Sequence, residues 1–246
     1  IDYCGVQTPR HKNRFISLGV KKNNIEVTGN LKFDIALPNI NSGAVESAKN
    51  LVGHRTVLLG ASTHEGEEDV LLMIFRDLLF LFPNLLLILA PRHMNRISRV
   101  NSLAWRYGYN PELFSKTDYL SADKNILIID EMGLLPSIYF CAHVAFVGGS
   151  LVPLGGHNML EGVRAGCPVI MGPFIENIED IVRDFEETGG MSIVKDASAL
   201  KNEIKRLMLD SSLRSQMKMA ANAILESNKG SLEITESGIV NAINRS

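Results

Sequence analysis

The amino-acid sequence predicts an α/β fold built on a doubly wound parallel sheet, followed by a helical C-terminal tail. From about residue 55, short strand-like runs alternate with stretches whose apolar residues recur at helical spacing. The strand-like runs are apolar throughout, as expected for strands that helices cover on both faces. Alternation of this kind is typical of parallel strands joined by helical crossovers.

The expected elements follow one another along the chain. Strands are expected at 56–60, 84–91, 125–130, 143–149, 167–172 and 191–196. Helices are expected between them at 65–83, 95–108, 134–142, 157–166 and 177–189. From Ala197 the chain predicts two or three further helices with Lys- and Glu-rich exposed faces. The first stretch, up to a linker near Pro38, predicts a strand, a helix and a strand. They form either the last unit of another domain or an extra edge of this one.

Composition narrows the class of protein. The 246 residues carry a formal net charge of −2, so no general attraction to nucleic acid or to an anionic membrane is expected. Cys4, Cys141 and Cys167 have no C-x-x-C spacing, which argues against a disulfide framework or zinc site and favours a reducing compartment. The longest apolar run is interrupted by Arg76 and Asp77 and is too short to span a bilayer. Because no signal peptide opens the chain and it does not begin with Met, we expect a fragment.

Ligands of open α/β sheets bind beyond the carboxyl ends of the strands, so the loops there are candidate sites. In the first loop, GASTHEGEE, Ser62 and Glu65 have the spacing of a capping box that starts the helix. A metal site at His64 and Glu68 is the alternative. The small turn before the helix favours contact between backbone amides and an anionic ligand, with the hydroxyls of Ser62 and Thr63 assisting.

The next two loops contribute fewer groups. Arg92 is suited to a phosphate or carboxylate, and His93 to donating a hydrogen bond; the alternative is a solvated strand end. The backbone groups of Met132 and Gly133 are candidates to contact the edge of a nucleotide base.

The fourth loop, GGSLVPLGGHNMLEGVRAG, has two glycine pairs, Gly148–Gly149 and Gly155–Gly156. Such a loop lets a ligand contact main-chain N–H groups near a helix N-terminus. It matches neither the P-loop nor the dinucleotide fingerprint. His157 and Glu161 are four residues apart on the expected helix and so can face one pocket. A carboxylate there is placed to accept both hydroxyls of a ribose. A metal bound by these two residues, or a flexible loop with a surface pair, are the alternatives.

Several motifs occur in one order over most of the chain: VTGNLKFD (27–34), ASTHEGEE (61–68), PRH (91–93), MGLL (132–135), FVGGSLVPLGGHNMLE (146–161) and GCPVIMGP (166–173). Together they closely resemble the C-terminal half of the 3-deoxy-D-manno-octulosonic acid (Kdo) transferases. The resemblance implies a GT-B glycosyltransferase with two Rossmann-like domains. Residues 1–37 would be the remnant of the N-terminal domain with the interdomain linker, and 38–246 the Rossmann-like domain that binds the donor, CMP-Kdo.

The resemblance also implies an activity and a location. The family transfers Kdo, with inversion, from CMP-Kdo to a lipid A precursor at the cytoplasmic face of the inner membrane of Gram-negative bacteria. No metal, cofactor or nucleic acid is expected, and the fragment itself would be soluble. The membrane anchor, the acceptor site and the glutamate that acts as general base belong to the N-terminal domain, so this chain alone is expected to be inactive.

Position by position, the resemblance implies that Glu161 binds the ribose and that Gly155, Gly156, His157 and Asn158 surround the phosphate. The full set expected to bind the nucleotide sugar is Ser62, Thr63, Arg92, His93, Met132, Gly133, Gly149, Ser150, Gly155, Gly156, His157, Asn158 and Glu161. The chain has Met159 and Gly162 where the family usually has Pro. Two alternatives stay open, another GT-B enzyme that uses a UDP-sugar and a non-catalytic nucleotide-binding module.

Overall fold

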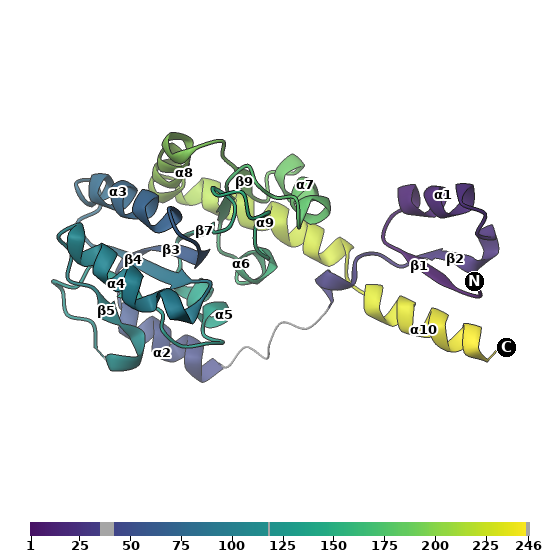
Figure 1. Ribbon diagram of the computed structural model, residues 1–246, viewed down its shortest axis with the longest axis horizontal. Helices are drawn as coiled ribbons and strands as arrows, with labels where there is room; N and C mark the ends of the chain where they lie inside the picture. Colours follow the sequence, from purple (N-terminus) through teal and green to yellow (C-terminus); the bar gives the residue numbers. More distant parts are fainter. Residues whose placement is uncertain (35–41, 118, 245–246) are drawn as a thin grey trace. The chain divides into compact units, whose positions relative to one another are not determined.

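The computed structural model describes residues 1–34, 42–117 and 119–244. Within them the chain forms two compact units (Figure 1). The terminal unit contains the described residues of Ile1–Asn39 and of Ala223–Ser246, and the sheet unit those of Ile40–Asn222. All the candidate site residues lie in the sheet unit.

The sheet unit contains a seven-stranded parallel sheet with the strand order β5-β6-β4-β3-β7-β8-β9. The strands are β3 (Thr56–Thr63), β4 (Leu85–Pro91), β5 (Glu112–Leu113), β6 (Ile126–Ile128), β7 (Val144–Val147), β8 (Val169–Met171) and β9 (Ser192–Ile193). From β3 the chain passes to β4, then to the edge strand β5 and back to β6, which lies between β5 and β4. From β7 it moves outward on the other side through β8 to β9. This topology confirms the predicted doubly wound sheet.

Helices cover both faces of the sheet. The helices of this unit are α2 (Ser42–Val52), α3 (Glu67–Leu79), α4 (Ile97–Arg106), α5 (Leu135–Ile138), α6 (Leu160–Arg164), α7 (Glu179–Glu187), α8 (Ala197–Leu209) and most of α9 (Ser211–Ser227). Short 3-10 turns are η3 (Met94–Arg96), η4 (Phe114–Lys116) and η5 (Tyr139–Cys141).

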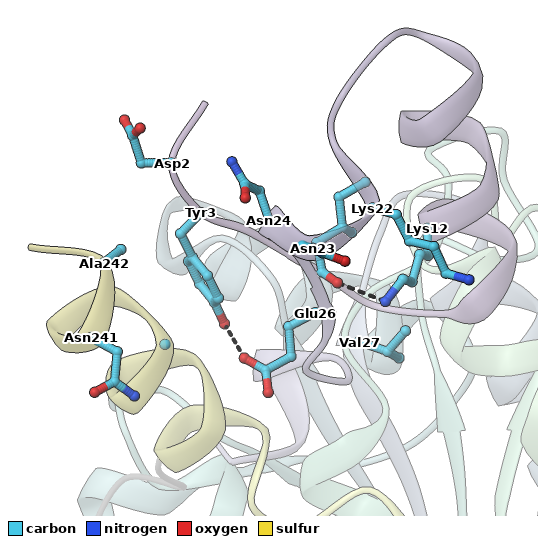
Figure 2. A pocket seen from close by; sticks show the side chains of 12 residues that line it. Asp2, Tyr3, Lys12, Lys22, Asn23, Asn24, Glu26, Val27, Asn241 and Ala242 are labelled. Carbon is cyan, nitrogen blue, oxygen red and sulfur yellow. Dashed lines mark hydrogen bonds between the residues drawn. The ribbon is translucent and has the colours of Figure 1, made fainter. Parts of the chain in front are cut away.

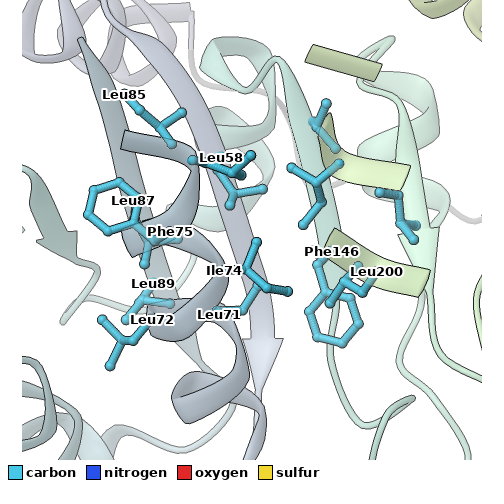
Figure 3. Close-up of a cluster of buried hydrophobic side chains, with 14 of the residues drawn as sticks. Leu58, Leu71, Leu72, Ile74, Phe75, Leu85, Leu87, Leu89, Phe146 and Leu200 are labelled. Carbon is cyan, nitrogen blue, oxygen red and sulfur yellow. The ribbon is translucent and has the colours of Figure 1, made fainter. Parts of the chain in front are cut away.

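One core packs α3, α4 and α8 against alternate residues of the central strands. Leu58, Leu87 and Phe146 point to this face and are fully buried, as Figure 3 shows. The intervening residues Leu59 and Ile88 are also 0% exposed, so they are covered on the opposite face. Burial on both faces explains why these strands are continuous apolar runs.

The structure contains two elements that the sequence analysis did not predict, and two of its helices start later than predicted. Helix α2 and the edge strand β5 were not expected; β5 has two half-buried residues, which is too short for a pattern. Helix α3 begins at Glu67 and not near Glu65, and α6 begins at Leu160 and not at His157.

The terminal unit contains the predicted strand, helix and strand. Strands β1 (Cys4–Val6) and β2 (Ile25–Val27) pair in parallel, and α1 (Pro9–Ser17) connects them. Two 3-10 turns, η1 (Lys22–Asn24) and η2 (Leu31–Phe33), and the C-terminal helix α10 (Ser231–Ile243) complete the unit. The predicted linker end at Pro38 lies outside the described residues, and the domain limits at 37 and 38 stay a prediction.

Residues from Ala223 onward group with the terminal unit, although the sequence analysis assigned them to the second domain. The carboxylate of Asp34 accepts hydrogen bonds from the N–H groups of Gly230 (3.0 Å) and Leu232 (2.8 Å) and so caps α10. Gly238 lies against the ring of Tyr3, where a side chain would collide with it. These contacts attach α10 to the N-terminal stretch.

The terminal unit also has a polar pocket of about 1050 Å³, shown in Figure 2. In it the Tyr3 hydroxyl donates to Glu26 (3.1 Å) and Lys12 donates to the carbonyl of Ile25 (2.7 Å). The Glu26 bond and burial raise the pKa of Tyr3 to about 12, with burial the larger cause. None of the candidate site residues lines this pocket.

No helix in the described part of the chain has the length and apolarity needed to cross a membrane.

Candidate nucleotide site

The candidate residues gather at the carboxyl edge of the sheet, because they follow four neighbouring parallel strands. Ser62 and Thr63 end β3, Arg92 and His93 follow β4, Met132 and Gly133 follow β6, and the glycine loop at 148–158 follows β7. Four of them, Ser62, Arg92, Met132 and Gly133, line one pocket of about 130 Å³. The structure therefore brings together residues from the first three loops.

The end of β3 is irregular. The pairing register shifts between Ala61 and Thr63, and Ser62 has a φ of +51°, a conformation that non-glycine residues rarely adopt. As a result Ser62 faces the pocket, while Thr63 is fully buried and does not line it. The Thr63 hydroxyl has no hydrogen-bond partner among the described residues.

The predicted capping box at Ser62 and Glu65 is wrong. Gly66, with a φ of +92°, is the N-cap of α3, and no side chain caps the helix there. Glu65 instead forms an exposed ion pair with Arg99. The helix starts later than expected because the glycine provides the left-handed turn into it.

Glu68 does not support the alternative of a metal site with His64. Its carboxylate is buried and binds Arg96 in a bidentate pair, at 2.7 and 3.1 Å. The pairing raises the pKa of Arg96, mainly through the hydrogen bond to Glu68. In the described part of the chain no three His, Cys, Asp or Glu side chains are grouped so as to hold a metal ion.

Glu67 is a structural residue that the sequence analysis did not recognise. It is 0% exposed, and its carboxylate accepts four backbone hydrogen bonds of 2.9–3.1 Å. The donors are the N–H groups of His64, Gly149, Ser150 and Leu151. The sequence contains one signal for this burial: Glu67 stands four residues before Leu71 and eight before Phe75, on the buried face of α3.

The glycine loop is held by its own hydrogen bonds. The N–H of Gly156 donates to Gly149 (2.8 Å), and the N–H of His157 donates to Gly148 (3.2 Å). The N–H groups of residues 149–151 donate to Glu67, so few loop amides remain for a ligand. In the described chain, the N–H groups of Gly155 and Asn158 have no internal acceptor.

Ser150 is fully buried inside this loop. Its hydroxyl donates to the carbonyl of Val147 (2.5 Å) and accepts from the N–H of Gly172 (2.8 Å). Gly155 and Gly156, with φ of +82° and +75°, allow the loop to turn tightly against Asn177 and Met171. Ser150 therefore joins β7 to the end of β8, and its fully buried hydroxyl is out of reach of a ligand.

Three histidines meet beside the loop. The Nε2 atoms of His64 and His157 lie 2.6 Å apart, so one ring donates to the other, and the rings stack with centroids 4.9 Å apart. His93 contacts His64 edge-on at 5.5 Å. Burial, with smaller contributions from His64, Arg92 and His93, lowers the pKa of His157 to about 4. His157 is therefore neutral near pH 7.

Glu161 is a half-buried acidic residue at this edge. It lies in the first turn of α6, after Asn158, whose side chain accepts from the N–H of Leu160 (3.0 Å). Because the helix starts at Leu160, the expectation that His157 and Glu161 share one helix is wrong. Burial raises the pKa of Glu161, partly offset by Arg92. Among the described residues its carboxylate has no hydrogen-bond or ion-pair partner.

Comparison with known proteins identifies the family and the fold of the chain. Residues 118–224 match the family described as glycosyl transferases group 1. The C-terminal CMP-Kdo binding domain of WaaA from Acinetobacter baumannii is similar in structure, with a TM-score of 0.71 and 28% identity. That match covers 74% of this chain and 98% of that domain.

Curated relatives give the same result. The 3-deoxy-D-manno-octulosonic acid transferase of Haemophilus influenzae is 33% identical over 222 residues, which are 89% of this chain and 52% of the relative. The enzyme of that name from Bordetella pertussis is 31% identical over 96% of this chain and 55% of its own length. The chain thus spans about half the length of these relatives. By sequence and by structure, it belongs to the 3-deoxy-D-manno-octulosonic acid transferases and corresponds to their C-terminal half.

Proposed function

We propose that this chain is the donor-binding half of an enzyme that transfers Kdo from CMP-Kdo to a lipid A precursor. The acceptor site and the general base belong to the other half of the enzyme, which acts at the cytoplasmic face of the inner membrane. The similarity to the CMP-Kdo binding domain of WaaA and to the curated transferases supports this assignment.

The proposal depends mainly on Glu161. A carboxylate that is half-buried and unpaired retains both oxygens for the two hydroxyls of a ribose. Arg92, close enough to affect the pKa of Glu161, provides a permanent positive charge for the phosphate or for the Kdo carboxylate. In the described chain the N–H groups of Met132 and Gly133 have no acceptor, so they are available to the edge of the base.

The reaction explains why this half needs a partner. The acceptor hydroxyl oxygen attacks the anomeric carbon of Kdo while the bond from that carbon to the phosphate oxygen of CMP breaks. The proton of the hydroxyl passes to a base on the side opposite the leaving CMP. The donor half stabilises the charge that develops on the departing phosphate, with Arg92 and the free loop amides as donors. Donor and acceptor must also be aligned by both halves. This chain alone is therefore expected to bind nucleotide without transferring sugar.

Calorimetric titration with CMP tests the proposal, with UDP as comparator and EDTA present. We expect saturable CMP binding that Glu161→Gln weakens by about tenfold or more, because an amide accepts poorly from two hydroxyls. Glu187→Gln, on the exposed end of α7, is the matched control and should leave the affinity unchanged. Absence of CMP binding by the folded chain contradicts the proposal, and tighter binding of UDP favours the alternative of a UDP-sugar enzyme.

A further inference from the structure

Glu67 makes more contacts than a helix cap requires. One of its four hydrogen bonds comes from its own turn, at His64. The other three come from Gly149, Ser150 and Leu151, which are 82–84 residues further along the chain. No Lys or Arg pairs with Glu67 in the described part of the chain. Backbone N–H groups therefore provide all the hydrogen bonds that this buried carboxylate requires.

These bonds connect the two loops that contain the histidine pair. The same oxygen, Oε2, accepts from the N–H of His64 and the N–H of Gly149, both at 2.9 Å. The ring of His157 lies directly over Gly149, 3.1 Å from the position of a Cβ there, and its Nε2 contacts that of His64. Glu67, His64, His157 and Gly149 thus form a closed ring of contacts.

This arrangement also explains the first glycine pair, Gly148 and Gly149. A Cβ on Gly148 would lie 2.4 Å from the Ser62 carbonyl oxygen and 2.7 Å from Oε2 of Glu67. The glycines therefore permit the approach of Glu67 and His157, and they leave little room for a ligand at the 148–149 backbone. Because both oxygens of Glu67 are occupied and the residue is 0% exposed, a direct part in binding or proton transfer is excluded.

We propose that Glu67 is a positioning residue of the nucleotide site, which holds the loop after β7 so that His157, and beyond it Glu161, face the donor. This inference rests on the proposed function, since the donor is the nucleotide sugar assigned above. Glu67 acts through the loop and touches no substrate.

Glu68 provides a matched control for the test. It is the next residue of the same helix turn and equally buried, but its carboxylate binds Arg96 and no part of the loop. Glu67→Gln replaces one acceptor oxygen with an N–H donor that faces other N–H groups. We expect Glu67→Gln to weaken CMP binding about tenfold or more and Glu68→Gln to change it less than about twofold, although both lower the melting temperature. Equal losses of affinity in both variants would overturn the proposal.

A measurement without ligand separates this inference from the proposed function. The pKa of His157, followed by NMR of its ring proton, is lowered mainly by burial and to a smaller extent by His64, Arg92 and His93. Loss of the negative charge of Glu67 would by itself lower a histidine pKa further, so a rise reports movement of the loop. We expect Glu67→Gln to raise that pKa from about 4 by about one unit or more, because the loop moves, and Glu68→Gln to leave it unchanged. If wild-type chain binds no CMP, the proposed function fails while this titration still decides the role of Glu67.

If Glu67→Gln does not fold, Glu67→Asp, which withdraws the carboxylate by one methylene, is subject to the same criteria. An unchanged His157 pKa in the folded variant refutes the proposal.

Discussion

Three glutamates near the carboxyl edge of the sheet differ in their partners, and the partners separate structural from functional residues. Glu67 is satisfied by four amides, and Glu68 by Arg96. Glu161 has neither kind of partner, although burial disfavours its charged form. Burying a carboxylate without a partner costs free energy that a ligand recovers on binding. Glu161 is therefore the residue of the three that a ligand is expected to contact.

The raised pKa of Glu161 predicts a pH dependence of nucleoside binding. A protonated carboxyl cannot accept from both ribose hydroxyls, so affinity is present above the raised pKa and is lost as pH falls through it. Cytidine is the suitable ligand because it has no phosphate to titrate. We expect its affinity, measured by calorimetry, to fall as the pH is lowered through the raised pKa of Glu161, at a higher pH than an ordinary glutamate allows. Glu161→Gln should bind weakly and with a flat profile. Parallel profiles for both proteins would contradict the assignment.

At the scale of the elements, the loop after β7 depends on close approach of backbones. The Ser62 carbonyl, the Thr63 Cα and Glu67 all lie within 2.7 Å of a Cβ on Gly148, and two of these atoms belong to the backbone and cannot rotate away. The joint between β3 and β7 is therefore sterically tight.

Gly148→Ala is expected to destabilise the fold by about 2–4 kcal/mol, because the strand ends must separate to admit the methyl group. Gly53→Ala is the comparison for conformational strain without crowding: Gly53 has a φ of +61° and open space around its Cβ, whereas Gly148 is crowded and has no positive φ. The cost of Gly53→Ala is expected to be about 1–2 kcal/mol, from the left-handed conformation alone. Chemical denaturation of both variants measures the difference, and equal losses would show that the packing argument is wrong.

The elements also show what sequence patterns can and cannot predict. Strands β3, β4 and β7 could be located because burial on both faces makes each a continuous apolar run. The start of α6 could not, since the Gly-rich loop folds back through hydrogen bonds to Gly148 and Gly149 before the helix begins. The role of Glu67 was missed for a related reason. Three of its four partners lie more than 80 residues away, and no local pattern identifies them.

For the candidate site, the loops could be identified because parallel strands end at one edge. The sequence did not distinguish side chains that face a pocket from those that build the loop. Ser62 faces a pocket because of a register shift and a positive φ, whereas Thr63 and Ser150 are fully buried. Such differences of one residue depend on tertiary contacts.

On the scale of the whole molecule, the two units have cores of very different size. Among the described residues, the buried apolar side chains of the terminal unit are Val6, Ile25, Phe33, Ile224 and Leu225, against several dozen in the sheet unit. Stability increases with the apolar area removed from water, so the terminal unit is expected to open with the lower free energy. Amides of β1, β2 and α10 should exchange with deuterium faster than those of β3, β4 and β7.

Asp34 provides a specific test of this difference, because its carboxylate accepts the first N–H groups of α10. Asp34→Ala removes the cap, and we expect it to lower the local stability of α10 by about 0.5–2 kcal/mol. Asp196→Ala is the matched control, since Asp196 caps α8 in the sheet unit by accepting from Ala199 at 2.8 Å. In hydrogen–deuterium exchange, Asp34→Ala should accelerate the exchange of the α10 amides and leave that of the β3 and β4 amides unchanged. Asp196→Ala should accelerate amide exchange at the start of α8 only. Unchanged exchange of α10 in Asp34→Ala would mean that contacts other than this cap, such as that of Gly238 with Tyr3, hold the C-terminal helix in its unit.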